Sequence, residues 1–296
     1  MFPISIISQY GNKIEKINIV GIRSLYTTTT VPSPRNIFGY TYDSTTNIAY
    51  VCGGYNNSAV YNDLWSFNLI TREWKLLSNA PVSTYGSALC AYMGNIYLFG
   101  GITNNQGAVN NNFYVYNITT NTWSQNATSI GKPAQSTYSK LVSAGDGNLY
   151  LWGSPGTSNL YSYNISTNTW KALTASTIAN NSTGDMCTDG SYLYCQGSAG
   201  QKYNISTGQW STIPLYGSIA GRMVYNYYDS NIYCISNNVM NLGKYDSSTN
   251  TWSTLYVNST ITGSTGSLFP SNNKNEIFYV LGYEGSSRTN KQYVFN

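Results

Sequence analysis

One short motif recurs five times in this chain of 296 residues and constrains its fold more than any other feature. Each copy has Asn or Asp, two residues, Thr, two more residues and Trp, as in "NISTNTW" at 164–170. The five motifs end at Trp74, Trp123, Trp170, Trp210 and Trp252, so they are spaced by 49, 47, 40 and 42 residues. A period of about 45 residues is typical of the four-stranded blades of a β-propeller.

A second signal precedes each motif. Short apolar stretches, most of them ending in Gly, read as strands that finish in a tight bend. They cover 47–54, 94–101, 147–154, 191–198, 231–238 and 276–283. Six such stretches against five Trp motifs indicate six blades, of which the last is incomplete.

The chain stops at "YVFN" (293–296), where the other repeats continue to a Trp. A ring of blades must be closed so that no long sheet edge is exposed. The segment "GNKIEKINIV" (11–20) has Ile14 and Ile17 where other repeats have Trp and Leu. We therefore predict that residues 1–20 supply the outer strand of the last blade, and that the chain ends in mid-repeat because its first residues complete that blade.

The predicted fold is all-β: a six-bladed propeller in a single domain, residues 1–296, closed by an N-terminal strand. In the motif, Asn or Asp would shape a turn by bonding the backbone two residues on, and Trp would cover apolar surface. The predicted blades run approximately over 36–77, 83–127, 137–174, 183–214, 221–256 and 264–296.

The Gly-ended strand followed by the Trp motif resembles the kelch repeat, from about Asn36 to Asn296. The double Gly occurs in the first two units, as Gly53-Gly54 and Gly100-Gly101, and the Pro-Arg pair of the family occurs once, as Pro34-Arg35. The resemblance implies a kelch-type propeller. Because function depends on sites built onto a fold, it does not by itself imply a ligand.

Composition excludes function classes. The chain has no His, and its net charge of +4 comes without a run of Lys or Arg, so we expect no metal site, no cofactor and no nucleic-acid partner. No stretch approaches the roughly 20 apolar residues of a membrane helix, and the start lacks a secretory signal pattern. Among five Cys without a CxxC pair, Cys187 and Cys195 flank a predicted hairpin, and a disulfide between them stays open.

We do not predict an enzyme. A glycosidase needs two carboxyl groups in one cleft, whereas several of the eleven acidic residues fall in predicted turns. The most plausible enzyme analogue is a sugar-converting propeller of the sialic acid epimerase type. Asp185, Arg222 and Glu284 would lie near a channel mouth, but nothing in the sequence groups them.

A binding face is predicted instead. The loops between strands 2 and 3 and the segments that join blades share one face of a propeller, and here they are long, polar and contain Tyr and Arg, which suit recognition. An alignment of inner-strand starts places four of these side chains at similar heights at the channel mouth: Arg35, Tyr85, Tyr138 and Arg222. The full set of candidate ligand-binding residues is Arg35, Tyr55, Tyr85, Asn105, Gln106, Tyr138, Tyr216, Arg222, Tyr283 and Arg288.

The function we expect is a non-enzymatic binding module on a cell or virion surface. Low charge and richness in Tyr, Asn and Thr resemble surface or virion proteins of thermoacidophilic archaea. The expected partner is a protein or glycan on a cell or particle surface, with assembly into a larger particle as one form of that contact. Candidate glycosylation sites are Asn56, Asn126, Asn181 and Asn258. An intracellular kelch scaffold with a protein partner is the alternative.

Overall fold

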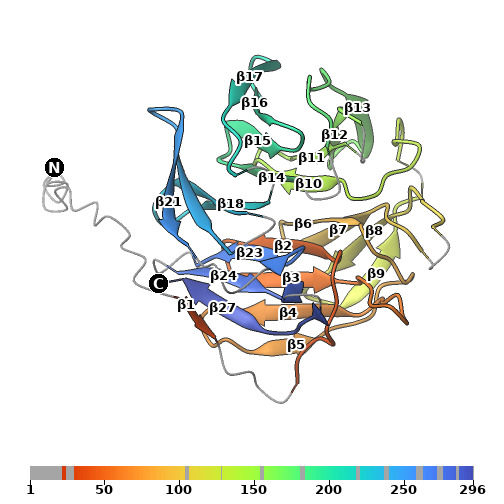
Figure 1. The fold of residues 1–296 in the computed structure, drawn as a ribbon. Coiled ribbons are helices and arrows are strands. Elements are labelled where there is room, and N and C mark those ends of the chain that lie inside the picture. The colour runs from red at the N-terminus through yellow and green to blue at the C-terminus, as the bar shows by residue number, and fades with distance from the viewer. Residues whose placement is uncertain are drawn as a thin grey trace, which may run out of the picture.

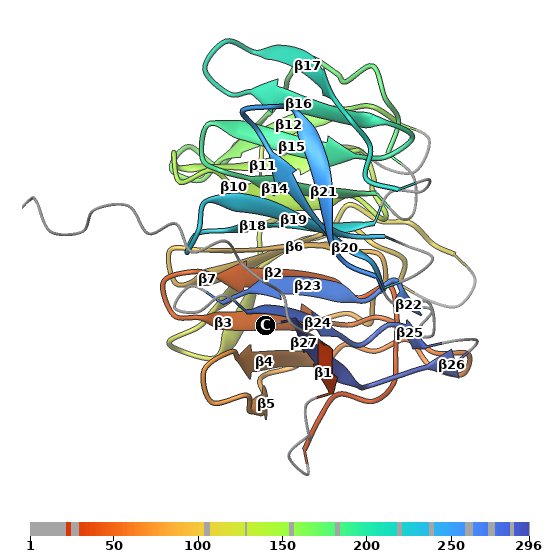
Figure 2. The same ribbon diagram turned by 60° about the vertical axis from the view of Figure 1, so that its left-hand side comes forward.

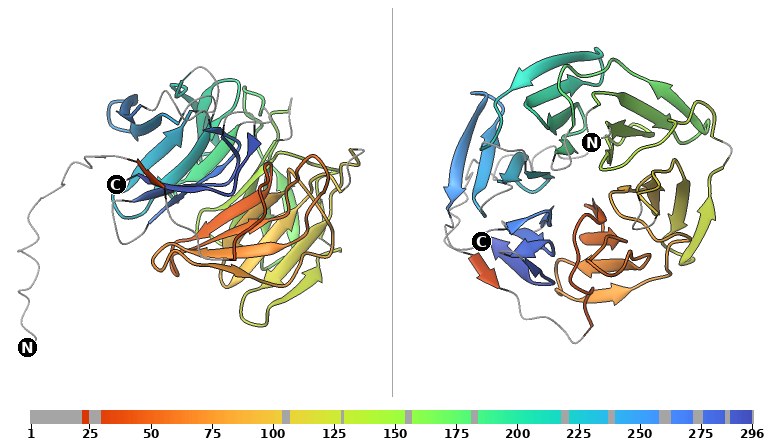
Figure 3. Two further views of the ribbon diagram at one scale, coloured as in Figure 1. Left: turned by 60° about the horizontal axis from the view of Figure 1, so that its bottom comes forward. Right: turned by 45° about the vertical axis from the view of Figure 1, so that its right-hand side comes forward.

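The computed structural model describes residues 22–24, 30–103, 107–127, 129–153, 157–180, 184–217, 221–236, 240–257, 263–271, 276–284 and 287–295. Within these residues the chain is all-β, and six four-stranded antiparallel sheets stand around a common axis (Figure 1). The right-hand view of Figure 3, along the axis of the ring, shows them as the blades of a propeller. The predicted fold is thereby confirmed.

Each of the first five blades consists of four consecutive strands, ordered from the axis outwards. Blade 1 holds β2 (Gly39–Asp43), β3 (Ile48–Cys52), β4 (Leu64–Asn68) and β5 (Trp74–Leu76), and blade 2 holds β6 (Ala88–Tyr92), β7 (Asn95–Phe99), β8 (Phe113–Asn117) and β9 (Thr122–Gln125). Blade 3 holds β10 (Lys140–Ser143), β11 (Asn148–Trp152), β12 (Leu160–Asn164) and β13 (Thr169–Ala172), and blade 4 holds β14 (Asp185–Thr188), β15 (Tyr192–Gln196), β16 (Gly200–Asn204) and β17 (Gln209–Ile213). Blade 5 holds β18 (Arg222–Asn226), β19 (Asn231–Ile235), β20 (Leu242–Asp246) and β21 (Thr251–Tyr256).

The sixth blade joins the two ends of the described chain. Its inner strands are β23 (Ser267–Pro270), β24 (Ile277–Val280) and β27 (Gln292–Phe295), and its outermost strand is β1 (Ile22–Ser24). The register of β1 on β27 runs from Ile22 opposite Phe295 to Ser24 opposite Tyr293. Figure 3 shows β1 in red at the outer edge of the blue blade. An N-terminal strand therefore closes the ring, and it begins at Ile22, whereas the predicted segment 11–20 lies outside the described residues.

The ring presents two different faces. One, the loop face, carries the strand 2–3 loops and the blade-joining segments; the other, the turn face, carries the short strand 1–2 and 3–4 turns. A small sheet of β22 (Gly263–Ser264), β25 (Tyr283–Glu284) and β26 (Ser287–Arg288) extends blade 6 on the loop face (Figure 2).

The repeated motif builds the turn between strands 3 and 4 of a blade. In blade 4, Asn204 Oδ1 accepts hydrogen bonds from the backbone N–H groups of Ser206 and Thr207, both at 3.0 Å. The Trp of each motif then contacts an aromatic ring directly opposite on the third strand. The pairs are Phe67–Trp74, Tyr116–Trp123, Tyr163–Trp170, Tyr203–Trp210 and Tyr245–Trp252, with ring centroids 4.7 to 5.2 Å apart.

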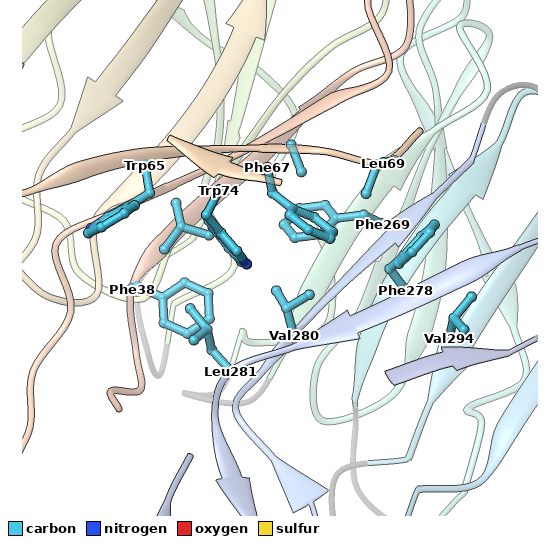
Figure 4. Close-up of a cluster of buried hydrophobic side chains, with 12 residues drawn as sticks. Phe38, Trp65, Phe67, Leu69, Trp74, Phe269, Phe278, Val280, Leu281 and Val294 are labelled. Carbon is cyan, nitrogen blue, oxygen red and sulfur yellow. The ribbon is translucent and has the colours of Figure 1, made fainter. Parts of the chain in front are cut away.

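Apolar side chains fill the spaces between blades. Between the first and last blades, a buried cluster joins Phe67 and Trp74 of blade 1 to Phe278 and Val280 of blade 6 (Figure 4). The rings of Phe67 and Phe278 meet edge to face at 5.9 Å. This packing ties the two ends of the ring together, because burying one such aromatic side chain stabilises a fold by roughly 2–3 kcal/mol.

The double Gly after the second strand has a structural reason in blade 1. Gly53 and Gly54 have φ angles of 65° and 92°, which favour Gly. The Gly54 N–H donates to the carbonyl oxygen of Thr84, in the segment joining blades 1 and 2, at 2.7 Å. A Cβ atom on Gly53 would lie 2.2 Å from that same oxygen. The bend therefore lets one blade dock closely against the connection to the next.

We expect Gly53→Ala to destabilise the protein by about 3 kcal/mol or more, because it adds a backbone clash to the strain of a positive φ. Gly94→Ala is the matched control, since Gly94 has a φ of 73° but no heavy atom within 4 Å of the added Cβ; its cost should be about 1 kcal/mol. Thermal or urea unfolding measures both. Equal costs would contradict the docking role of Gly53.

Candidate functional site

The loop face holds Tyr55 in a fixed position. Tyr55 follows the double Gly of blade 1 and forms an isolated bridge with Asn36, in which each backbone N–H donates to the other residue's carbonyl at 3.1 Å. On blade 6, the hairpin of β25 and β26 places Tyr283 opposite Arg288. Backbone pairing thus fixes the main-chain positions from which the side chains of Tyr55, Tyr283 and Arg288 extend.

Four half-buried side chains from these loops contact one another. The rings of Tyr55 and Tyr85 lie 4.8 Å apart, and the guanidinium carbon of Arg288 lies 4.6 Å from the centre of the Tyr55 ring. The same guanidinium lies 5.1 Å from the centre of the Tyr283 ring. We call Tyr55, Tyr85, Tyr283 and Arg288 the tyrosine–arginine cluster. It joins blade 1, blade 6 and the segment between blades 1 and 2.

Two amides orient the arginine of this cluster. Arg288 Nε donates to Asn36 Oδ1 and one terminal nitrogen donates to Asn57 Oδ1, both at 2.7 Å. Burial and the neighbouring Tyr55 raise the pKa of Tyr85 above its ordinary value, so Tyr85 stays neutral at physiological pH. The cluster is therefore a pre-oriented aromatic surface with a positive charge on it.

Tyr138 lies beside this cluster. Its backbone N–H donates to the carbonyl oxygen of Gly86, next to Tyr85, at 2.6 Å. Its pKa is raised by burial and, to a smaller extent, by Tyr85 and Tyr55. The structure thus brings together five of the candidate ligand-binding residues, and their role in binding stays a prediction.

Arg35 and Tyr216 occupy interior positions, contrary to the expectation that they face a ligand. Arg35 is 1% exposed and forms a bidentate ion pair with Asp63, in which one terminal nitrogen donates to Oδ2 at 2.8 Å and the other donates to Oδ1. It also donates to the carbonyl oxygen of Gly53. Tyr216 is 7% exposed and packs on Trp252 with ring centroids 5.1 Å apart. Both side chains hold segments between blades in place.

The other candidates on the loops differ in what the structure describes. Asn105, Gln106, Asn181 and Asn258 lie outside the described residues. The Asn56 side-chain nitrogen donates to the hydroxyl of Tyr61, and that of Asn126 donates to the hydroxyl of Tyr163 at 2.8 Å. The Asn126 nitrogen also donates to Asn168 Oδ1 at 2.9 Å, so a glycan there, which leaves one N–H, would displace one of its two bonds.

Arg222 lies deeper in the ring than predicted. It pairs with Ile235 at the end of β19, just as Lys140 pairs with Trp152 at the end of β11. Arg222 is thus equivalent to Lys140. The alignment of inner-strand starts had matched it with Tyr138, two residues earlier. It is 6% exposed, and its guanidinium donates to the carbonyls of Gly184 and Gly266 at 3.3 and 3.0 Å.

Arg222 belongs to a group of four side chains that closes the centre of the ring. Tyr40 of blade 1 donates its hydroxyl to Asp185 of blade 4 at 2.6 Å. The carboxylate of Asp185 also accepts from the backbone N–H groups of Met186 and Met223, both at 2.9 Å. The guanidinium of Arg222 lies 5.7 Å from the centre of the Tyr40 ring. Tyr40, Lys140, Asp185 and Arg222 form what we call the channel plug.

Lys140 is the least satisfied member of the plug. Its Nζ lies 4.0 Å from Asp185 Oδ1 and 5.0 Å from the centre of the Tyr40 ring. Burial and, to a smaller extent, the charge of Arg222 lower the pKa of Lys140 to about 7, against the opposing effect of Asp185. Tyr40 lies 145 residues from Asp185 in the sequence, and no motif links the two. The first residues of the inner strands in blades 3, 4 and 5 are nevertheless Lys140, Asp185 and Arg222, and this succession was a usable signal.

The five cysteines are the other side chains in which the sequence left a question open. All five cysteines are buried and free, and Cys195 lies opposite Met186 in the sheet, so Cys187 and Cys195 are not bridged. In the part of the chain that the structure describes, no group of His, Cys, Asp or Glu is arranged to hold a metal ion. None of the described residues forms a helix long and apolar enough to cross a membrane.

Comparisons with known proteins agree with the architecture. A family model described as "KLHDC2/KLHL20/DRC7 Kelch-repeats domain" matches residues 17–198 and 79–234. Kelch domain-containing protein 10 from Rattus norvegicus and Homo sapiens is 37% identical over 60 residues, and that from Xenopus laevis is 39% identical over 62 residues. Each alignment covers 20% of this chain and 14–15% of the relative. The matched part is thus about 15% of the length of these curated relatives.

Proposed function

Because this chain belongs to the kelch-repeat domain family, we propose that it is a non-enzymatic binding module whose loop face docks a protein partner. The kelch propeller is a protein-interaction fold, and the tyrosine–arginine cluster is the feature of this chain that supports a docking site. Tyr and Arg are enriched among the residues that dominate binding energy at protein interfaces. A partner would bury the exposed halves of these side chains.

The pre-orientation of Arg288 is the observation that carries this proposal. Its guanidinium is held by Asn36 and Asn57 and lies against Tyr55 and Tyr283. Binding therefore orders few side chains, and the loss of conformational entropy on association is small. A cation held over aromatic rings suits an acidic or carbonyl-rich segment of a partner.

We further propose that the partner is presented on a cell or particle surface. Only 9% of the residues are charged, while Tyr alone contributes 29 residues. Neutral amides and hydroxyls keep their solubilising effect in acid, where carboxylates become protonated. A glycan carried by the partner is compatible with the same face, because aromatic rings cover sugar faces.

Arg288→Ala tests the proposal. Cytosol, envelope and released particles of the source are incubated separately with the immobilised chain, and captured proteins are quantified by mass spectrometry. We expect the variant to retain at least tenfold less of a direct partner than the wild type, as for a central arginine of an interface. Enzymatic removal of glycans from the extract shows whether a sugar is part of the ligand.

Lys171→Ala is the matched control, because it removes one positive charge from the exposed face of outer strand β13 and should leave capture unchanged. Equal capture by the wild type and Arg288→Ala would reject the loop-face proposal. A partner recovered only from the cytosol would reject the surface location and favour an intracellular scaffold.

A further inference from the structure

A cavity of about 540 Å³ lies on the propeller axis, on the other side of the ring from the tyrosine–arginine cluster. All six inner strands contribute to its wall. Its rim includes strand 1–2 turns, among them 43–45, 92–94, 143–145 and 188–190, so it opens on the turn face. The volume is within the range of pockets that hold small molecules, roughly 300–1,000 Å³.

The channel plug forms the inner end of this cavity. Tyr40, Lys140 and Asp185 line it, whereas Arg222 is not part of its wall. Tyr40 reaches across the axis to Asp185, so the cavity is blocked in that direction. A ligand would enter from the turn face and meet the plug with its leading group.

The plug contains two basic groups and one carboxylate among the described residues. Asp185 is already engaged by three hydrogen-bond donors, and its charge favours the protonated form of Arg222. Lys140 Nζ forms no hydrogen bond to any residue that the structure describes, and Asp185 lies at 4.0 Å. A largely buried ammonium requires an anionic partner. With both basic groups charged, the four side chains of the plug thus have one positive charge in excess.

The remainder of the wall is largely apolar. It includes Ala88, Leu141, Met186, Met223, Val224 and Phe269. At the mouth, the rings of Tyr225 and Tyr227 meet edge to face at 5.0 Å, and Met93 is 77% exposed. The inner end of this largely apolar pocket thus carries the Lys140 ammonium beside the engaged carboxylate of Asp185, and Asp43 and Asp189 line the cavity near its mouth.

We propose that the central cavity binds a small monocarboxylic acid with an aromatic or aliphatic body, its carboxylate on Lys140 and its body among the apolar walls. A doubly charged anion fits less well, because the plug has an excess of only one positive charge. This site is independent of the loop-face interface, so either can fail without the other.

Binding should depend on pH through Lys140. Tyr40 of β2, Asp185 of β14 and Arg222 of β18 lie around it, and Cys90 of β6 and Cys187 of β14 line the same cavity. Burial raises the pKa of Tyr40, Cys90 and Cys187, so these are neutral at pH 7. The free amine of Lys140 titrates with a pKa of about 7, and a bound carboxylate favours the ammonium form. Binding therefore takes up a proton above pH 7, and affinity falls by up to tenfold per pH unit as the pH rises.

Phenylacetate and octanoate are suitable probes for calorimetric or NMR titration of the full chain. We expect both to bind at pH 6 at least tenfold more tightly than at pH 9. Phenylacetamide, which has the same body without the charge, should bind the wild type at least tenfold more weakly than phenylacetate. Lys140→Met should lose at least tenfold in affinity for both acids.

Lys202→Met is the control variant, because Lys202 also lies over a tyrosine ring, Tyr192 at 4.9 Å, but outside the cavity; it should bind like the wild type. If Lys140→Met does not fold, the comparison of phenylacetate with phenylacetamide on the wild type decides. Equal binding of these two probes, or no binding of either acid at millimolar concentration, would overturn the proposal.

Discussion

Asp185→Asn is expected to lower the melting temperature by about ten degrees. Asp185 is 2% exposed and accepts hydrogen bonds from the Tyr40 hydroxyl and two backbone N–H groups. The amide cannot accept all three, and it removes the negative charge of Asp185 that favours the protonated form of Arg222. Removing one partner from a buried charged network costs about 3–5 kcal/mol. For a chain of this size, each kcal/mol shifts the melting temperature by roughly 2–4 °C.

Asp246→Asn is the matched control, because it makes the same chemical change in an exposed turn of the repeated motif. The other four motifs have Asn at this position: Asn68, Asn117, Asn164 and Asn204. The melting temperature of this variant should equal that of the wild type in calorimetry or circular dichroism. If Asp185→Asn also melted like the wild type, the channel plug would not be a stabilising network.

Deletion of residues 1–24 is expected to have the second large effect. It removes β1, which pairs with β27 over three residue positions. We expect a loss of about 3 kcal/mol, because each backbone hydrogen bond contributes about 1 kcal/mol and, among the described strands, only β1 pairs with the outer edge of β27. An exposed strand edge also favours pairing between molecules. The truncated protein should therefore melt roughly ten degrees lower and associate at higher concentration.

Deletion of residues 1–20 distinguishes the structure from the sequence-based prediction. The sequence placed the closing strand at 11–20, whereas the described strand is Ile22–Ser24. The shorter deletion keeps that strand, so it should melt close to the full chain, and size-exclusion chromatography should show a monomer fraction equal to that of the full chain. If the two deletions were equally damaging, Ile22–Ser24 would be insufficient to close the ring.

The large effect of both changes has one physical origin. A propeller is a ring in which each blade packs on two neighbours, and the axis is reached by one strand of every blade. A carboxylate at the axis therefore contacts several blades at once, and a closing strand determines whether the first and last blades stay together. An exposed turn such as that of Asp246 contacts only its own blade.

The sequence was sufficient to determine the repeat and, from it, the fold. The Trp motif and the Gly-ended strand act over short distances: Asn204 bonds residues two and three positions on, and each Trp meets an aromatic ring on the adjacent strand. Such local rules can be read from one repeat and counted along the chain. The six blades and an N-terminal closing strand followed from that count.

Only the tertiary structure decided which candidate residues face solvent and which close the axis. The period of the repeat gives the height of a residue on its blade, but it does not give the direction of the side chain. Arg35 and Arg222 are as polar as Arg288, yet they are buried. Asp63, in the strand 2–3 loop of blade 1, satisfies Arg35, and carbonyls of the segments that lead into blades 4 and 6 satisfy Arg222. The contact of Tyr40 with Asp185 joins residues 145 positions apart, and it exists because ring closure sets blade 1 across the axis from blade 4.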